Sequence, residues 1–134
     1  MTVGVLIVTH NGVGSALLET AKTTLGVCPL NTKILSVPDQ CSPGDLVNEG
    51  QSYVDELDTG DGVLILTDMF GSTPSNIACA LKSTTRLCIV SGLNLPMLIR
   101  TLNYPALDLE ELATKALSGG REGIGDCQKL GYFN

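Results

Sequence analysis

Residues 3–12 read VGVLIVTHNG, and this stretch decides the fold. Its first part is almost continuously apolar, so a strand made from it is buried on both faces. Strands of that kind are typical of parallel sheets that have helices packed on each side. The apolar run stops at Thr9 and His10, and Asn11-Gly12 then supplies a turn before a helical pattern begins.

Strand and helix patterns alternate along the rest of the chain. Apolar residues at helical spacing predict helices, and short apolar runs bounded by turn residues predict strands. The predicted strands cover residues 3–9, 33–37, 62–67 and 85–90, and the predicted helices cover residues 12–25, 43–57, 73–81, 97–102 and 109–117. Together they predict an α/β fold, a doubly wound, mainly parallel four-stranded sheet in the order 2-1-3-4 with helices on both faces.

The ends of several helices carry their own signals. Ser42-Pro43 and Thr73-Pro74 each place a capping residue before a proline, which favours the start of a helix. Asp108 is predicted to cap the last helix, because Glu111 stands three residues later in the position of a capping box. Gly119-Gly120 is predicted to end that helix.

The length of 134 residues suits one domain with a core of its own. We place that domain over residues 1–120 and treat residues 121–134 as a C-terminal tail. The tail is rich in glycine, and its pattern leaves open an extra strand, a surface arm and a disordered end. No internal repeat, linker or low-complexity segment interrupts the chain.

Composition excludes several classes of function. The net charge is −6 and the sequence pI is about 4.5, without a basic cluster, which argues against nucleic acid and anionic membranes as partners. No apolar run reaches the roughly 20 residues that a membrane helix needs, and no signal peptide is recognisable, so we expect a cytoplasmic protein that is not membrane-embedded. A single histidine among five scattered cysteines excludes a His-rich metal site, and we expect neither metal nor cofactor.

The chemistry is expected where the strands end. In open α/β sheets, ligands bind outside the carboxyl ends of the strands at the point where the strand order reverses. His10 follows the first predicted strand and Asp68 follows the third, so the order 2-1-3-4 places them side by side. A carboxylate that accepts from one imidazole N–H leaves the other ring nitrogen as a nucleophile able to attack phosphorus.

A phosphoryl group on that histidine needs hydrogen-bond donors. Gly71, Ser72 and Thr73 lead into a predicted helix, whose free N–H groups and dipole favour an anion. Pro74 lacks an N–H, so Ser75 is a further candidate donor. Each feature also has a purely structural reading: a lone histidine is more often structural, Asp68 is equally well a turn residue, and Thr73-Pro74 is an ordinary helix start. Their convergence on one edge of the sheet favours function.

Three segments resemble a known family, the IIA component of the mannose class of the phosphoenolpyruvate-dependent sugar phosphotransferase system. The first is GVLIVTH at residues 4–10. The second is LTDMFGSTPSN at residues 66–76, which is similar to the pattern D-[LM]-[FW]-G-G-S-P-x-N. The third is SGLNLPML at residues 91–98. The resemblance extends from residue 3 to about residue 120.

The resemblance implies roles for residues in these segments. It implies that His10 accepts a phosphoryl group from the carrier protein HPr and passes it to a IIB component, as a phosphotransferase with a phosphohistidine intermediate. It implies that Asp68 orients His10 and that Thr73 helps to hold the phosphate. We assign supporting places to Thr9 and Asn94. The resemblance also implies a homodimer, in some members with an exchanged C-terminal strand.

The chain departs from the family pattern at three positions. Asn11 stands where many members have glycine, Ser72 replaces the second glycine of a pair, and Thr73 replaces serine. Threonine keeps the hydroxyl, whereas Ser72 is less tolerant of positive φ than glycine. Because the sequence ends soon after the last predicted helix, we expect a separate IIB partner.

Other functions compete with transport of a sugar, which the sequence does not identify. A regulatory module sensed through its phosphorylation would have the same site residues. The phosphocarrier subunit of dihydroxyacetone kinase shares the fold and the early histidine, but resembles the second and third segments less. Dinucleotide binding is disfavoured because Leu17 occupies the third glycine position of G-x-G-x-x-G. A serine hydrolase is disfavoured because no G-x-S-x-G motif occurs.

Overall fold

The computed structural model describes residues 2–131. The elements follow one another in the predicted β-α-β-α-β-α-β-α-α order. The strands are β1 (Gly4–His10), β2 (Thr32–Val37), β3 (Val63–Thr67) and β4 (Leu87–Ser91), and the helices are α1 (Val13–Leu25), α2 (Pro43–Leu57), α3 (Thr73–Ala80), α4 (Leu95–Leu102) and α5 (Leu109–Glu122).

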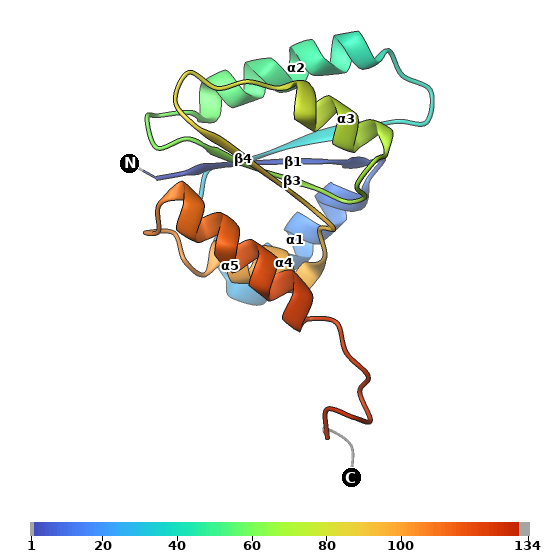
Figure 1. The fold of residues 1–134 in the computed structure, drawn as a ribbon, viewed down its shortest axis with the longest axis vertical. Helices are drawn as coiled ribbons and strands as arrows, with labels where there is room; N and C mark the ends of the chain where they lie inside the picture. The colour runs from blue at the N-terminus through green and yellow to red at the C-terminus, as the bar shows by residue number, and fades with distance from the viewer. Residues whose placement is uncertain (1, 132–134) are drawn as a thin grey trace.

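The four strands form one parallel sheet in the order β2-β1-β3-β4, which confirms the prediction. Figure 1 shows α2 and α3 on one face of the sheet and α1, α4 and α5 on the other. The register aligns Val8 of β1 with Thr67 of β3, and Thr67 with Ser91 of β4. His10 lies two residues beyond Val8 and Asp68 lies one residue beyond Thr67, so both are brought to the same edge.

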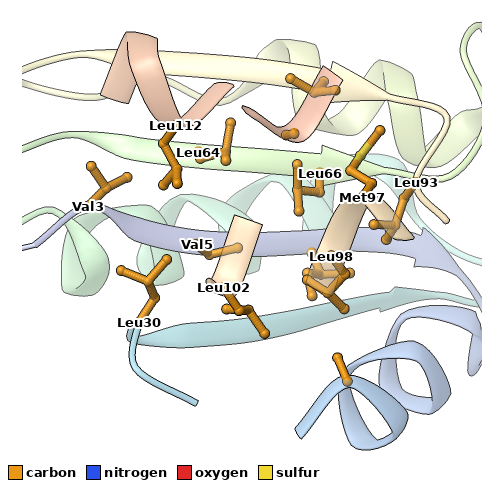
Figure 2. Close-up of a cluster of buried hydrophobic side chains, with 14 of the residues drawn as sticks. Val3, Val5, Leu30, Leu64, Leu66, Leu93, Met97, Leu98, Leu102 and Leu112 are labelled. Atoms are coloured by element: carbon orange, nitrogen blue, oxygen red, sulfur yellow. The ribbon is translucent and has the colours of Figure 1, made fainter. Parts of the chain in front are cut away.

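Each face of the sheet has its own hydrophobic core. Side chains of β1 alternate between the two, because successive residues of a strand point to opposite faces. Val5 and Ile7 pack with α1, α4 and α5, in the core drawn in Figure 2. Leu6 and Val8 pack with α2 and α3. Burial of β1 on both faces explains why its sequence is apolar without alternation.

The last helix is longer than its sequence indicates. Gly119-Gly120 was predicted to end it, and this prediction is wrong, since α5 continues to Glu122. A Cβ on Gly119 would lie 2.5 Å from the Cβ of Arg100, and one on Gly120 would lie 2.7 Å from Cε of Met97. These glycines let α5 approach α4 closely; they do not terminate the helix. Asp108 caps the helix as predicted, accepting from the backbone N–H of Glu111 at 2.9 Å.

The start of α3 also differs in detail from the prediction. Thr73 was expected to cap this helix, but Ser72 occupies the N-cap position and Thr73 is the first helical residue. Pro74 is therefore second in the helix, where its missing N–H costs no intrahelical hydrogen bond. Ser42 precedes Pro43 at the start of α2 as expected, although its side chain makes no capping hydrogen bond.

Asp58 is the C-cap of α2, at the end of the sheet where the strands begin. It links α2 to the segment before β4. The carboxylate accepts hydrogen bonds from the hydroxyls of Ser83 and Thr85 and from the N–H of Gly60. These bonds, above all that from Ser83, hold the pKa of Asp58 below its ordinary value. The network joins segments that are distant in sequence.

Beyond α5 the chain leaves the domain as an arm (Figure 1). Residues 123–131 contain turns and no strand, so the possible extra C-terminal strand does not occur within them, and residues 132–134 lie outside the described residues. Ile124 in this arm is 76% exposed. None of the helices within residues 2–131 is long and apolar enough to cross a membrane.

Candidate functional site

His10 and Asp68 meet at the carboxyl edge of the sheet. His10 is the last residue of β1, and Asp68 directly follows β3, the neighbouring strand. Nδ1 of His10 lies 2.9 Å from Oδ2 of Asp68. The strand order, together with the register, creates this contact between residues 58 positions apart in the chain.

The same carboxylate oxygen holds the backbone of the histidine. The N–H of His10 donates to Oδ2 of Asp68 at 3.0 Å, so one oxygen fixes both the ring and the main chain. Within residues 2–131, Oδ1 of Asp68 is buried without a hydrogen-bond partner. The side chain of Asp68 is 14% exposed and that of His10 is 35% exposed. The carboxylate is therefore shielded while the ring remains accessible.

The contact to Asp68 decides which ring nitrogen is available. A carboxylate accepts hydrogen bonds, so it favours the tautomer that carries the proton on Nδ1. Nε2 then keeps its lone pair and is the nucleophilic atom of the ring. The same carboxylate stabilises a positive charge on the imidazole if Nε2 forms a new bond. This arrangement suits transfer of a group onto Nε2.

A cavity of about 350 Å³ opens beside His10. The end of β2 and the loop before α2 form one wall, and the start of α3 forms another. The residues that line it are His10, Val37, Pro38, Asp39, Cys41, Pro43 and Thr73. A group bonded to the histidine ring therefore has room next to the first turn of α3.

The predicted phosphate-binding residues surround the start of α3, which lies beside the ends of β1 and β3 (Figure 1). Gly71 has a φ of 83°, a conformation that favours glycine. Ser72 donates from its hydroxyl to the carbonyl of Met69 at 2.6 Å, which holds the loop. Thr73 is exposed and faces the cavity, whereas Ser75 is buried. Thr73 is thus the hydroxyl best placed to meet a group on His10.

Asn11 makes the turn that follows β1 in a left-handed conformation. Its φ is 42°, in the left-handed region that asparagine tolerates better than most residues. Its N–H donates to the carbonyl of Val37 at 3.0 Å, and its side-chain amide donates to Asp39 at 3.3 Å. The departure from glycine therefore leaves a turn that is anchored to the end of β2.

The two supporting residues have different surroundings. Thr9 is fully buried, and its hydroxyl accepts from the N–H of Gly14 at 2.8 Å, directly beneath the turn that follows His10. Asn94 caps α4 by accepting from Met97 at 2.9 Å and donates to the carbonyl of Gly120 at 3.1 Å. The hydrogen bonds of Asn94 therefore join α4 to α5 and do not reach His10.

Sequence reasoning missed the exposed apolar side chains at this edge. Met69 is 57% exposed and Phe70 is 83% exposed, in the loop that joins Asp68 to α3. The signal was present, because large apolar residues directly after a buried strand, within a turn, have no core to enter. It also missed Asp39 and Cys41, which line the cavity only because the loop after β2 folds against His10.

Residues 2–131 contain no group of three or more potential metal-ligating side chains.

A comparison with known families agrees with this geometry. The family model for the PTS system fructose IIA component, EIIA-man, matches residues 4–117, from the start of β1 into α5. The chain belongs to this family of PTS IIA components. Both His10 and Asp68 lie within the matched region, as do all the candidate phosphate-binding residues.

Individual relatives support the assignment. The chain is 33% identical over 129 residues to the mannose-specific EIIAB component of the PTS from Escherichia coli strain K12. The match covers 92% of this chain but only 39% of that protein, so the chain spans well under half of the length of its curated relative.

Solved structures share the fold. The Streptococcus agalactiae phosphotransferase system component EIIA superposes with a TM-score of 0.81 at 24% identity, over 95% of this chain and 98% of that chain. The mannose/sorbose-specific IIA subunit from Enterococcus faecalis gives a TM-score of 0.82 at 23% identity, over 94% and 95% of the two chains. The names of the family model, of the Escherichia coli relative and of the Enterococcus faecalis subunit mention different sugars, so they do not define a sugar for this chain.

Proposed function

We propose that this chain is a phosphoryl carrier of the sugar phosphotransferase system, in which His10 accepts a phosphoryl group from phosphorylated HPr and passes it to a IIB component. The observation that carries the proposal is the 2.9 Å contact between Nδ1 of His10 and Oδ2 of Asp68, which leaves Nε2 as the nucleophile. Membership of the PTS IIA family supports the same role. The chain then acts in the cytoplasm as a phosphotransferase component with a phosphohistidine intermediate.

The transfer step follows from the tautomer. The lone pair of Nε2 forms a bond to phosphorus while the bond between phosphorus and the donor atom breaks. The proton on Nδ1 stays in its hydrogen bond to Asp68, so the phosphorylated ring is cationic and the carboxylate offsets that charge. Reversal of the same step on a different partner passes the phosphoryl group on.

The start of α3 receives the charge of the phosphoryl oxygens. The N–H groups of a first helical turn have no intrahelical acceptor, and the helix dipole favours an anion there. We assign Thr73 as the hydroxyl donor and the backbone around Gly71, Ser72, Thr73 and Ser75 as the source of N–H donors. No step requires a metal.

The exposed side chains of Met69 and Phe70 provide the apolar part of a docking surface for HPr and IIB. They lie in the loop that follows Asp68, the residue that contacts His10. Aromatic side chains and methionine are enriched in protein–protein interfaces relative to the rest of the surface. The homodimer implied by the resemblance is a separate prediction and is not needed for the transfer step.

A direct experiment tests the carrier role. The purified chain is incubated with phosphoenolpyruvate, enzyme I and HPr, and its intact mass is measured before and after brief acid treatment. We expect the addition of one acid-labile phosphoryl group, absent in His10→Ala. An unmodified mass, from a folded chain in a mixture that phosphorylates an established IIA protein, would contradict the proposal.

A further inference from the structure

We infer that Thr9 is a positioning residue for phosphoryl transfer, because its buried hydroxyl fastens the start of α1 to the end of β1 and so sets the turn that presents His10. The inference rests on the function proposed for His10. Thr9 itself points to the opposite face of the sheet from His10 and acts through the backbone.

The hydroxyl of Thr9 makes two hydrogen bonds inside the protein. Oγ1 accepts from the N–H of Gly14 at 2.8 Å, and it donates to the carbonyl of His10 at 3.4 Å. Thr9 is 0% exposed, so water does not replace either partner in the folded state. A hydroxyl has one hydrogen to donate and lone pairs to accept, so both bonds form at once.

The helix that follows needs this acceptor. α1 has Gly12 at its N-cap, which has no side chain to accept from the first-turn N–H groups. Gly14 is the second residue of α1, the position that an N-cap side chain ordinarily serves. The hydroxyl of Thr9, in the preceding strand β1, therefore takes the place of an N-cap side chain. This hydrogen bond connects the start of α1 to the end of β1.

The close approach depends on glycine at position 14. A Cβ there would lie 2.7 Å from Cγ2 of Ile7 and 2.9 Å from Oγ1 of Thr9. Real Cβ atoms do not approach other atoms so closely, so α1 starts against β1 only because Gly14 has no side chain. Thr9 and Gly14 therefore depend on each other. Thr9 supplies the hydrogen-bond acceptor, and the absence of a side chain on Gly14 allows the helix to come close enough to donate.

This pair supports one side of the turn that carries His10. On the other sides, Asn11 is held by the carbonyl of Val37 and His10 is held by Asp68. Without the hydrogen bond between Thr9 and Gly14, the end of β1 is no longer held against the start of α1, while the contact of His10 with Asp68 can persist. Displacement of a nucleophile by about 1 Å costs up to roughly 10²-fold in rate, so a loosened turn slows transfer without weakening partner binding.

The test compares Thr9→Val, which keeps the shape but removes the hydroxyl, with Thr9→Ser, which keeps the hydroxyl. Thr101→Val is a matched control, because Thr101 is equally buried and its hydroxyl donates to the carbonyl of Met97 in α4, away from His10. Rates of phosphoryl transfer from phosphorylated HPr are measured at several HPr concentrations to separate kcat from KM. Thermal unfolding and the nitrogen chemical shifts of His10 are recorded for each variant.

We expect Thr9→Val to lower kcat by about 10-fold or more with KM changed by less than about twofold, as loss of orientation predicts. The nitrogen shifts of His10 should change in Thr9→Val, Thr9→Ser should restore most of the rate, and Thr101→Val should lose stability but keep kcat. Transfer by folded Thr9→Val at the normal rate would overturn the inference. So would equal losses in Thr9→Val and Thr9→Ser, or in Thr9→Val and Thr101→Val.

Two further readouts keep the test decisive. If Thr9→Val does not fold, Thr9→Ala is compared with Thr9→Ser in the same way. Equal kcat values for these two variants would overturn the inference. If the unaltered chain accepts no phosphoryl group, the proposed function fails by itself. The structural part of the inference, that Thr9 sets the turn at His10, is then tested separately. It holds if loss of the hydroxyl accelerates amide exchange at Gly14 and shifts the His10 resonances, and it fails if neither changes.

Discussion

Oδ2 of Asp68 lies 2.9 Å from Nδ1 of His10 and 3.0 Å from the backbone nitrogen of the same residue. One carboxylate oxygen thus holds both the ring and the main chain of the histidine. The tautomer and the orientation of the ring depend on the same atom, so removal of its charge weakens the control of both together.

Asp68→Asn should slow phosphoryl transfer to His10 by about 10- to 10²-fold, because a hydrogen bond to a charged group is replaced by a weaker neutral one. The amide also no longer offsets the positive charge of the phosphorylated ring. Single-turnover transfer from phosphorylated HPr measures the effect. Transfer by folded Asp68→Asn at the rate of the unaltered chain would show that the carboxylate does not orient or stabilise His10.

Thr73→Val should weaken the phosphorylated state, because it removes the hydroxyl nearest to the cavity beside His10. We expect the equilibrium between this chain and HPr to shift by about 10-fold toward phosphorylated HPr, the value of one lost hydrogen bond to a charged group. Thr73→Ser, the control, should behave like the unaltered chain. The ratio of phosphorylated species is read from intact masses. Equal ratios for the valine and serine variants would remove Thr73 from the phosphate site.

Phe70→Ala should raise KM for HPr or for the IIB partner by about 10-fold with little change in stability, since an exposed aromatic side chain contributes to docking and not to the core. Ile124→Ala is the matched control, because Ile124 is 76% exposed in the C-terminal arm, compared with 83% for Phe70. Steady-state transfer and thermal unfolding are measured for both. A KM for Phe70→Ala indistinguishable from that of Ile124→Ala would place the docking surface elsewhere.

Asp58→Asn should destabilise the protein in a pH-dependent way. Hydrogen bonds from Ser83 and Thr85 lower the pKa of Asp58, so its carboxylate stabilises the fold above the pKa of the unfolded chain. That contribution is lost as the pH falls through the lower, folded pKa. The difference in urea midpoint between Asp58→Asn and the unaltered chain should be largest near about pH 7 and shrink toward about pH 2. A constant difference across this range would contradict the linkage.

Gly119→Ala should lower the free energy of unfolding by roughly 1–3 kcal/mol, because the new Cβ meets the Cβ of Arg100 and forces α4 and α5 apart. Gly44→Ala is the matched control, since a Cβ at Gly44, also in a helix, meets no atom within 4 Å. Urea unfolding should find the control neutral or slightly stabilised, because alanine is the better helix former. Equal effects of the two substitutions would contradict close packing at Gly119.

The strands and most helix starts could be predicted from hydrophobic periodicity and from capping and turn residues. The apolar run at the start of the chain predicted a strand buried on both faces, and β1 has that burial. The end of α5 could not be predicted from the sequence, because the same Gly-Gly sequence can end a helix or allow close packing of two helices. Only the position of Arg100 and Met97 on α4 distinguishes the two.

The site was predictable in part for the same reason. His10 ends one buried strand and Asp68 directly follows another, and the family resemblance named both. The surroundings of the ring were not predictable, since Asp39 and Cys41 reach the cavity through a loop whose path depends on tertiary contacts. The placement of Asn94 was not predictable either, because its two hydrogen bonds join α4 to α5 and not to the site.

The sequence by itself determined the order of strands and helices, the residues that stand at the strand ends and the chemical types available there. These are properties of neighbouring residues, governed by hydrophobic periodicity and by the backbone preferences of glycine, proline and capping side chains. The tertiary structure decided the 2.9 Å geometry of the contact between His10 and Asp68, the hydrogen bond that the N–H of Gly14 donates to Thr9, and the path of α5 past its glycine pair. Distances between residues that are remote in sequence depend on how closely helices and strands can pack against one another, and no local sequence pattern encodes those distances.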